Sequence, residues 1–197
     1  MSNELNRETA LASLYESGDT SLRRGDPQSA ELVEVPFVEL MNLRGDPDVP
    51  SFTGAIRATS GVDLPGTPNT ISEGDRYRAF WLAPDEWLLQ AVIPHPDPLA
   101  IRLEQKLGSI HHSVNDQSSG YSVMQLRGRD ARFILNKGCP LDLHPTVFRF
   151  GQCAQSHYFK AGVLLYPRDE QGGCWEIIVR RSFADYVARM LLDAMGD

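Results

Sequence analysis

The sequence is short of positive charge, and this excludes one class of partner. It contains 19 lysine and arginine residues against 26 aspartate and glutamate residues, which gives a formal net charge of −7. A surface that binds nucleic acid needs clustered lysine and arginine side chains to neutralise phosphates. Nucleic acid is therefore not an expected partner of this chain.

Long apolar runs are also missing. No stretch approaches the roughly 20 apolar residues of a membrane-spanning helix, and the chain does not open with the charged and then apolar pattern of a signal peptide. Of its 197 residues, 42% are hydrophobic, which is enough to bury a sizeable core. We expect a cytoplasmic protein.

Cysteine is scarce and widely spaced. The three cysteines, Cys139, Cys153 and Cys174, are odd in number and far apart, which argues against a disulfide framework and against a Cys-x-x-Cys metal site. Lys137 lies near Cys139 and can lower the pKa of its thiol, as at a reactive cysteine. A small buried thiol is the favoured interpretation of Cys139.

Motifs that bind cofactor phosphates are absent as well. The sequence has neither the Gly-x-Gly-x-x-Gly turn of dinucleotide-binding folds nor a Walker loop, and Gly172-Gly173 is typical of a hairpin turn. We therefore expect no cofactor in this chain.

The chain begins with a polar arm, residues 1–31, of mixed charge. Leu5, Leu11, Leu14 and Leu22 predict a short amphipathic helix within it, and residues 23–27 predict a loop. Such a segment buries little surface of its own, so we expect it to be frayed or to become ordered against a partner.

Two α+β lobes are predicted after the arm, at residues 32–112 and 113–197. In the first we expect strands within 32–35, 38–44, 75–82 and 86–93, and helices at 50–61 and 99–107, the former capped by Ser51 and stopped by Gly61. In the second we expect strands at 121–127, 153–157, 160–166 and 174–180, a helix at 129–136, and a last helix capped by Ser182.

Three pairs of segments repeat in the same order. Residues 39–45 (ELMNLRG) align with 122–128 (SVMQLRG), 61–65 (GVDLP) with 140–145 (PLDLHP), and 87–93 (WLLQAVI) with 175–181 (WEIIVRR). Each half therefore reads strand–helix–strand–strand–helix. One such unit exposes an apolar sheet face, so we expect the two units to pack together and bury it.

Four stretches carry a resemblance to a known family. Residues 137–145 (KGCPLDLHP), 151–155 (GQCAQ), 181–186 (RSFADY) and 81–89 (WLAPDEWLL) resemble the gamma subunit of heterotetrameric sarcosine oxidase. The resemblance covers the chain from about Leu32 onward. It implies an internally duplicated α+β fold like the folate-binding domain of aminomethyltransferases.

The same resemblance implies a role and partners. Members of the gamma subunit family join alpha, beta and delta subunits in a flavoenzyme. That enzyme demethylates sarcosine to glycine and passes the one-carbon unit to tetrahydrofolate. That enzyme carries FAD, FMN, NAD and zinc, and the resemblance implies that the other subunits hold them. The expected function is that of a non-catalytic accessory subunit. A stand-alone folate-binding protein is the alternative, and an interaction module of unknown partner is a third possibility.

Several polar side chains are candidate site residues. His111-His112 can ligate a metal, but neighbours on a strand point to opposite faces and no third ligand is well spaced. His144 with Asp142 can act as an acid–base pair, although a turn role is favoured. Asp116 and Asp142 are the acids best placed for proton chemistry near a folate ring, yet neither lies in a matching motif.

Aromatic and basic side chains are further candidates, for ring stacking and for partner binding. Four aromatic side chains can stack on a pterin or flavin ring, but core or interface positions are the favoured interpretation: Trp81, Trp87, Phe159 and Trp175. Arg180-Arg181 can pair with carboxylates of a partner, or remain solvated. We therefore assign no catalytic, cofactor-binding or metal-binding residue to this chain.

Overall fold

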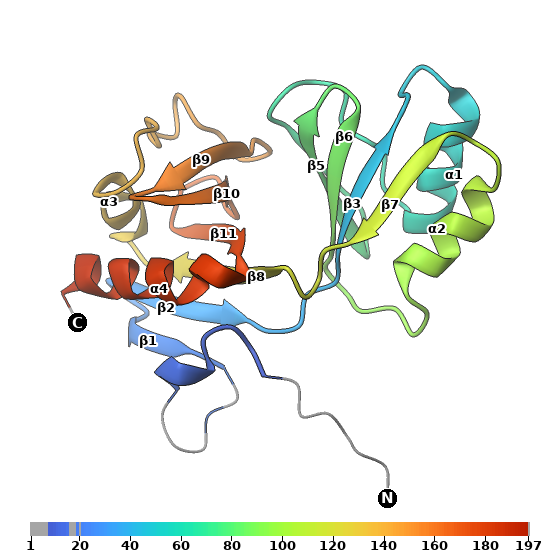
Figure 1. Cartoon of the computed structure of the whole chain (residues 1–197). Coiled ribbons are helices and arrows are strands. Elements are labelled where there is room, and N and C mark those ends of the chain that lie inside the picture. Colours follow the sequence, from blue (N-terminus) through green and yellow to red (C-terminus); the bar gives the residue numbers. More distant parts are fainter. Residues whose placement is uncertain (1–7, 16–18, 20, 197) are drawn as a thin grey trace, which may run out of the picture.

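The computed structural model describes residues 8–15, 19 and 21–196, and these form two antiparallel sheets with helices on their outer faces (Figure 1). The five-stranded sheet has the order β4-β5-β6-β3-β7, and the six-stranded sheet has the order β1-β2-β8-β11-β10-β9. The fold is α+β, as predicted. Within the described residues, no helix combines the length and apolar character needed to cross a membrane.

The five-stranded half is one continuous stretch, residues 40–116. Its elements are β3 (Leu40–Gly45), α1 (Pro50–Ser60), β4 (Ile71–Glu73), β5 (Tyr77–Ala83), β6 (Glu86–Ala91), α2 (Leu99–Leu107) and β7 (His112–Asp116). Helices α1 and α2 pack their apolar faces on one side of the sheet, where Phe52, Ile56 and Leu103 are fully buried.

The six-stranded half is split in sequence by the five-stranded half. Before it come the 3-10 turn η1 (Ala12–Leu14), β1 (Arg23–Asp26) and β2 (Ala30–Val35), and after it come β8 (Tyr121–Arg127), α3 (Ala131–Asn136), β9 (Ala154–Tyr158), β10 (Ala161–Pro167), β11 (Cys174–Arg180) and α4 (Arg181–Met195). Helices α3 and α4 cover the outer face of this sheet.

The sequence repeat is reproduced in the strand register. In the five-stranded sheet, Leu43 of β3 lies opposite Trp87 of β6. In the six-stranded sheet, Leu126 of β8 lies opposite Trp175 of β11. These four residues occupy matching positions in the aligned segments. The predicted internal duplication is therefore confirmed at the level of individual residue pairs.

The strand that precedes each repeat belongs to the other half. β2 leads into β3 but pairs with β8, and β7 leads into β8 but pairs with β3. The chain thus crosses between the halves twice, at residues 36–39 and 117–120. The two crossings are joined where the Leu40 carbonyl accepts a hydrogen bond from the Gln117 N–H at 2.8 Å. The predicted division at 32 and 113 does not follow these pairings, because residues 32–35 lie in the six-stranded sheet and 113–116 in the five-stranded sheet.

The described part of the polar arm does not match its predicted conformation. Residues 23–27, expected as a loop, contain strand β1, and the expected amphipathic helix is reduced to the three residues of η1. Leu11 and Leu22 are nearly inaccessible and pack into the core beneath α4. The described part of the arm is therefore held by apolar burial against its own chain. Leu5 of the predicted helix lies outside the described residues.

The predicted N-caps Ser51 and Ser182 are wrong, whereas the predicted helix stop at Gly61 is right. Helix α1 begins with Pro50 in its first turn and no side-chain cap, because proline already has a helical φ and lacks the N–H that a cap would satisfy. Helix α4 begins at Arg181, so Ser182 is already inside the helix. Gly61 ends α1 with φ of +75°, the left-handed conformation that glycine adopts without strain.

The inner faces of the two sheets form a hydrophobic cluster of their own, besides the one that each sheet forms with its helices. Leu40, Phe80 and Leu88 come from the five-stranded sheet, and Leu164, Tyr166 and Ile178 are among those from the six-stranded sheet. The predicted burial of one sheet face against the other is confirmed. The inner faces also meet at their edges, where residues 69–71 hydrogen-bond with 151–153.

Candidate functional site

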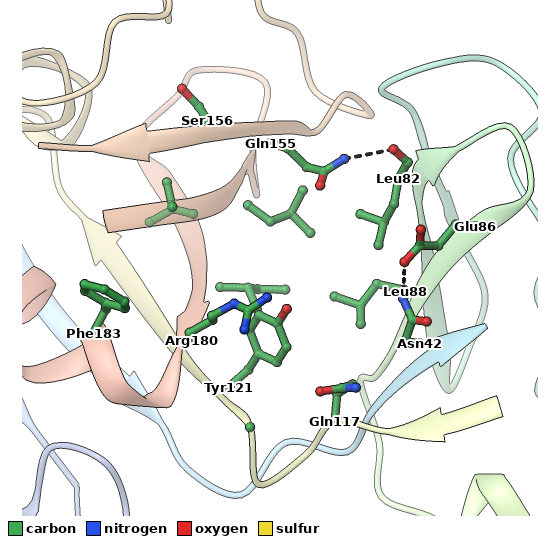
Figure 2. Close-up of a pocket in the computed structure, with 15 residues that line it drawn as sticks. Asn42, Leu82, Glu86, Leu88, Gln117, Tyr121, Gln155, Ser156, Arg180 and Phe183 are labelled. Carbon is green, nitrogen blue, oxygen red and sulfur yellow. Dashed lines mark hydrogen bonds between the residues drawn. The ribbon is translucent and has the colours of Figure 1, made fainter. Parts of the chain in front are cut away.

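A groove of about 720 Å³ separates the inner faces of the two sheets where they diverge (Figure 2). Its apolar base is formed by Leu88 of β6, Leu164 of β10 and Ile178 of β11. These residues point inward because strand side chains alternate between faces, and their neighbours in sequence face the helices. The groove therefore depends on both halves of the chain.

The polar residues of the groove are unequally satisfied. Glu86 accepts a hydrogen bond from Asn42 Nδ2 at 2.7 Å, and its other oxygen lies 3.9 Å from Arg44 Nε. Gln155 donates to the Leu82 carbonyl at 2.8 Å and so ties the two walls together (Figure 2). Arg180 extends into the groove beside Tyr121 (Figure 2).

A buried polar cluster continues the same strands beyond the apolar base. Gln90 and Tyr166 lie two residues after Leu88 and Leu164, and Glu176 lies two residues before Ile178. Each of the three has at most 2% of its surface exposed. The Glu176 carboxylate accepts hydrogen bonds from Tyr166 and from Gln90 on the opposite sheet. Arg168 Nη1 lies 3.2 Å from its other oxygen.

Arg78 completes this cluster from the five-stranded side. Its guanidinium donates to the Tyr166 hydroxyl at 3.1 Å and to Glu73 at 2.7 Å, although its side chain is only 5% exposed. Burial and the charge of Glu176 hold the pKa of the Tyr166 hydroxyl well above its ordinary value. Tyr166 therefore stays protonated and can donate to Glu176 while it accepts from Arg78.

The acids weighed for proton chemistry have structural roles. Asp116 is exposed and accepts hydrogen bonds from the Ser118 N–H and hydroxyl. Asp142 accepts from the His144 N–H at 2.9 Å, and His144 Nδ1 bonds to the Thr146 hydroxyl at 2.8 Å. The turn role expected of Asp142 and His144 is confirmed. None of the three lines the groove.

The histidine pair and the cysteines do not form a metal site. His112 is held by the Ile110 carbonyl and by Glu104, while His111 is exposed. In the part of the chain that the structure describes, no group of three potential metal ligands occurs. Cys139 is buried, and Lys137 donates instead to the Ala194 carbonyl. Burial raises the pKa of the Cys153 thiol to about 12, so this cysteine is unreactive at neutral pH.

The predicted aromatic candidates divide between core and surface. Trp87 and Trp175 are each 1% exposed, and their indole N–H groups donate to the Pro65 and Gly172 carbonyls. Trp81 is partly buried and Phe159 is 43% exposed on the turn between β9 and β10. Neither Trp81 nor Phe159 lines the groove. The core interpretation is confirmed for Trp87 and Trp175, because both are buried.

Sequence reasoning missed Glu176, Arg78 and Gln90. One signal was present: Glu176 interrupts an otherwise apolar strand, and a charge at such a position must be paired when it is buried. Its partner Gln90 is 86 residues away, and nothing in the sequence identifies that pairing. Of the basic candidates, Arg180 lines the groove, whereas Arg181 donates to the Glu8 carbonyl at 2.8 Å.

Comparison with known proteins shows which family the fold and sequence share. The chain is 35% identical to the sarcosine oxidase subunit gamma of Corynebacterium sp. (strain U-96), over the whole chain and 93% of that protein. It is 32% identical to the subunit gamma of Corynebacterium sp. (strain P-1), over 86% of the chain and 81% of that protein.

Solved structures agree with these relatives. A chain of the heterotetrameric sarcosine oxidase from Corynebacterium sp. U-96, in complex with pyrrole 2-carboxylate, superposes with a TM-score of 0.83 at 31% identity, over 96% of this chain and 95% of that one. The aminomethyltransferase T of the glycine cleavage system from Bartonella henselae has a TM-score of 0.65 at 13% identity, over 94% and 57% of the two chains. The second match concerns the fold alone, and it confirms the predicted aminomethyltransferase-like architecture.

The family model for "Sarcosine oxidase, gamma subunit family" matches residues 44–197, which is most of the chain. That range contains the last two residues of β3 and every element from α1 to α4. The chain belongs to the sarcosine oxidase gamma subunit family.

Proposed function

We propose that this chain is the gamma subunit of a heterotetrameric sarcosine oxidase and that it has no catalytic residue of its own. Its partners are then alpha, beta and delta subunits, which hold the FAD, FMN, NAD and zinc. The assembled enzyme demethylates sarcosine oxidatively to glycine and passes the one-carbon unit to tetrahydrofolate. The observation that carries the proposal is the match to a chain of a solved heterotetramer over nearly the full length of both chains.

The contacts of the candidate acid–base residues support an accessory role. Asp116, Asp142 and His144 cap turns, and His112 is held by a backbone carbonyl and a glutamate. A general base must reach a substrate proton with a free acceptor in a site that admits substrate. These side chains instead use their donors and acceptors in contacts with neighbouring residues of the same chain, which is what a scaffolding protein needs.

We further propose a cytoplasmic location, which the three cysteines fit. Cys139, Cys153 and Cys174 are all free thiols. Thiols persist in the reducing cytosol, whereas secreted domains commonly use paired cysteines.

Co-purification tests the proposal. The chain carrying an affinity tag is expressed in its native host and recovered under mild conditions, and bound proteins are identified by mass spectrometry. We expect three further chains in fixed ratio and the visible absorbance of oxidised flavin. The tagged chain made alone in another host should be colourless. Recovery from the native host as a free, colourless monomer would contradict the proposal.

One observation supports the alternative of a stand-alone folate-binding protein. The groove combines an apolar base with amide and charged side chains, as ligand pockets do. Titration calorimetry of the isolated chain with tetrahydrofolate distinguishes the two. Micromolar binding would support the alternative, and no heat of binding supports the accessory role.

A further inference from the structure

We propose that the groove between the sheets is the docking site for an extended segment of a partner subunit, and that an acidic side chain of that segment pairs with Arg180. This inference rests on the proposed function, because it assigns the surface through which the chain holds a partner. It concerns the groove of Figure 2 and not the buried polar cluster behind it.

The charges in the groove select an acid. On one wall, Glu86 already has hydrogen-bond and ionic partners in Asn42 and Arg44. On the other wall, the exposed Arg180 makes no side-chain hydrogen bond or ion pair with any residue that the structure describes. The open charge is therefore positive. A guanidinium binds a carboxylate through two parallel hydrogen bonds, and no carboxylate of the described residues makes such a pair with Arg180.

The amide side chains select a polypeptide. Gln117 and Gln155 lie at opposite ends of the groove with Arg180 and Leu88 between them (Figure 2). The Gln117 side chain makes no hydrogen bond to the described residues, and the Gln155 carbonyl oxygen likewise has no donor among them. A carboxamide both donates and accepts, as each peptide group does. Two such groups at separate points match the backbone of an extended chain.

The apolar lining supplies the energy of docking. Leu88 and Leu164 keep 5% and 7% of their surface exposed at the base of the groove, and Phe183 at the rim is 44% exposed. Most of the exposed apolar surface is therefore that of Phe183, and a partner side chain packed on it removes this surface from water. The groove thus offers an apolar anchor point beside one unsatisfied cation.

Gly162 allows a steric test that leaves the fold intact. It lies on β10 within the groove, its φ is not in the left-handed region, and an added Cβ meets no atom within 4 Å. Gly162→Trp therefore introduces a bulky ring at the groove from a position where the Cβ itself meets no atom. The matched control is Gly54→Trp on the exposed side of α1, where an added Cβ also meets nothing within 4 Å.

A charge test accompanies the steric one. Arg180→Glu reverses the unsatisfied cation of the groove. Arg57→Glu is its control, because Arg57 is exposed on the five-stranded half and, among the described residues, its side chain pairs with the exposed Asp63 alone, at 3.4 Å. All four variants should retain the circular dichroism spectrum and melting temperature of the parent protein, because all four positions are exposed and lie outside the core.

The full complex is purified through a tag on each variant, and the recovered partner chains are quantified by mass spectrometry. We expect Gly162→Trp and Arg180→Glu to reduce recovery about tenfold or more, which corresponds to the loss of one strong contact, while both controls match the parent. Undiminished recovery with both groove variants overturns the docking site while the proposed function stands. If the unmodified chain itself retains no partner, the proposed function fails first. A dimer of the isolated chain that Gly162→Trp converts to a monomer would make a second copy the occupant and would also overturn the inference.

Discussion

The two halves repeat the same strands, but they cover their outer faces by different means. The five-stranded half uses α1 and α2, of 11 and nine residues, and all of its chain is continuous. The six-stranded half uses the short α3, of six residues, the long α4, of 15 residues, and the N-terminal residues that carry Leu11 and Leu22. A duplicated unit can therefore keep its strand register while its helical cover is rebuilt from a different part of the chain.

The halves also differ in what they bring to their shared face. The six-stranded half supplies the carboxylate of Glu176, and the five-stranded half supplies Gln90 and Arg78. Each charge has a partner in its own half, Arg168 for Glu176 and Glu73 for Arg78. Hydrogen bonds from Gln90 to Glu176 and from Arg78 to Tyr166 then join the two halves. The polar cluster thus fixes how one half faces the other, and with that it fixes the groove that both halves line.

The largest expected effect comes from the two equivalent tryptophans. Trp87→Ala and Trp175→Ala each remove a fully buried ring and should lower the free energy of unfolding by about 3–5 kcal/mol. Because the inner cluster is built from both sheets, we expect one cooperative denaturant transition for each variant, monitored by circular dichroism. Two separate transitions in either variant would show that the halves unfold independently.

The next effect tests the N-terminal cover that only the six-stranded half has. Leu22 is 1% exposed in the core beneath α4, so Leu22→Ala should destabilise the protein by about 2–3 kcal/mol, the lower end for such truncations because a chain terminus can relax. Leu14, which is only partly buried against the same cluster, provides the control as Leu14→Ala. Equal and small losses of stability in urea titrations would mean that the arm is not part of the fold.

The contrast between the halves also shows what the sequence can predict. The apolar faces of 99–107 and 174–180 predict a helix and a strand whose bounds the structure reproduces. The repeat was likewise predictable, because three pairs of similar segments occur in the same order, one of them beginning with Trp87 and Trp175.

Strands β1, β4 and β7 were not predicted, since they are short or polar and exist only because a neighbour pairs with them. The exchange of β2 and β7 between the sheets was not predicted either, because the sequence of a strand does not identify the strand with which it pairs. For the site, Arg180 was identified as a candidate for partner binding, but the groove around it depends on residues such as Asn42 and Gln155 that are distant in sequence and individually unremarkable.

A smaller effect separates two glutamates on the shared face. Glu176→Gln leaves the shape of the side chain but removes the charge that Arg168 and Tyr166 contact, and should cost about 2 kcal/mol, as for hydrogen bonds to a buried charged group. Glu86→Gln changes an acid that is partly exposed at the groove, and should cost about 0–1 kcal/mol. Chemical denaturation of both variants at pH 7 measures the difference, and equal costs would contradict a special role for the buried cluster.

The smallest effect compares a tyrosine–glutamate pair in each half at alkaline pH. Tyr77 of the five-stranded half donates to Glu39 and accepts from Arg102, and Tyr15 of the six-stranded half donates to Glu34. Burial, with the neighbouring glutamate, raises the pKa of each tyrosine to about 12. The unfolded chain has tyrosine pKa values near 10.

These raised pKa values set the sign of the pH dependence. Below about pH 10 both states keep the tyrosine proton and the stabilisation is complete. Between about pH 10 and the folded pKa of about 12 only the unfolded chain ionises, so stability falls as pH rises. Tyr77→Phe should therefore show a shallower decline of melting temperature from pH 9 to 11 than the parent protein, and Tyr15→Phe should behave alike. Identical slopes in parent and variants would mean that neither hydroxyl is shielded, and a shallower slope in only one variant would show that the two halves protect their pairs unequally.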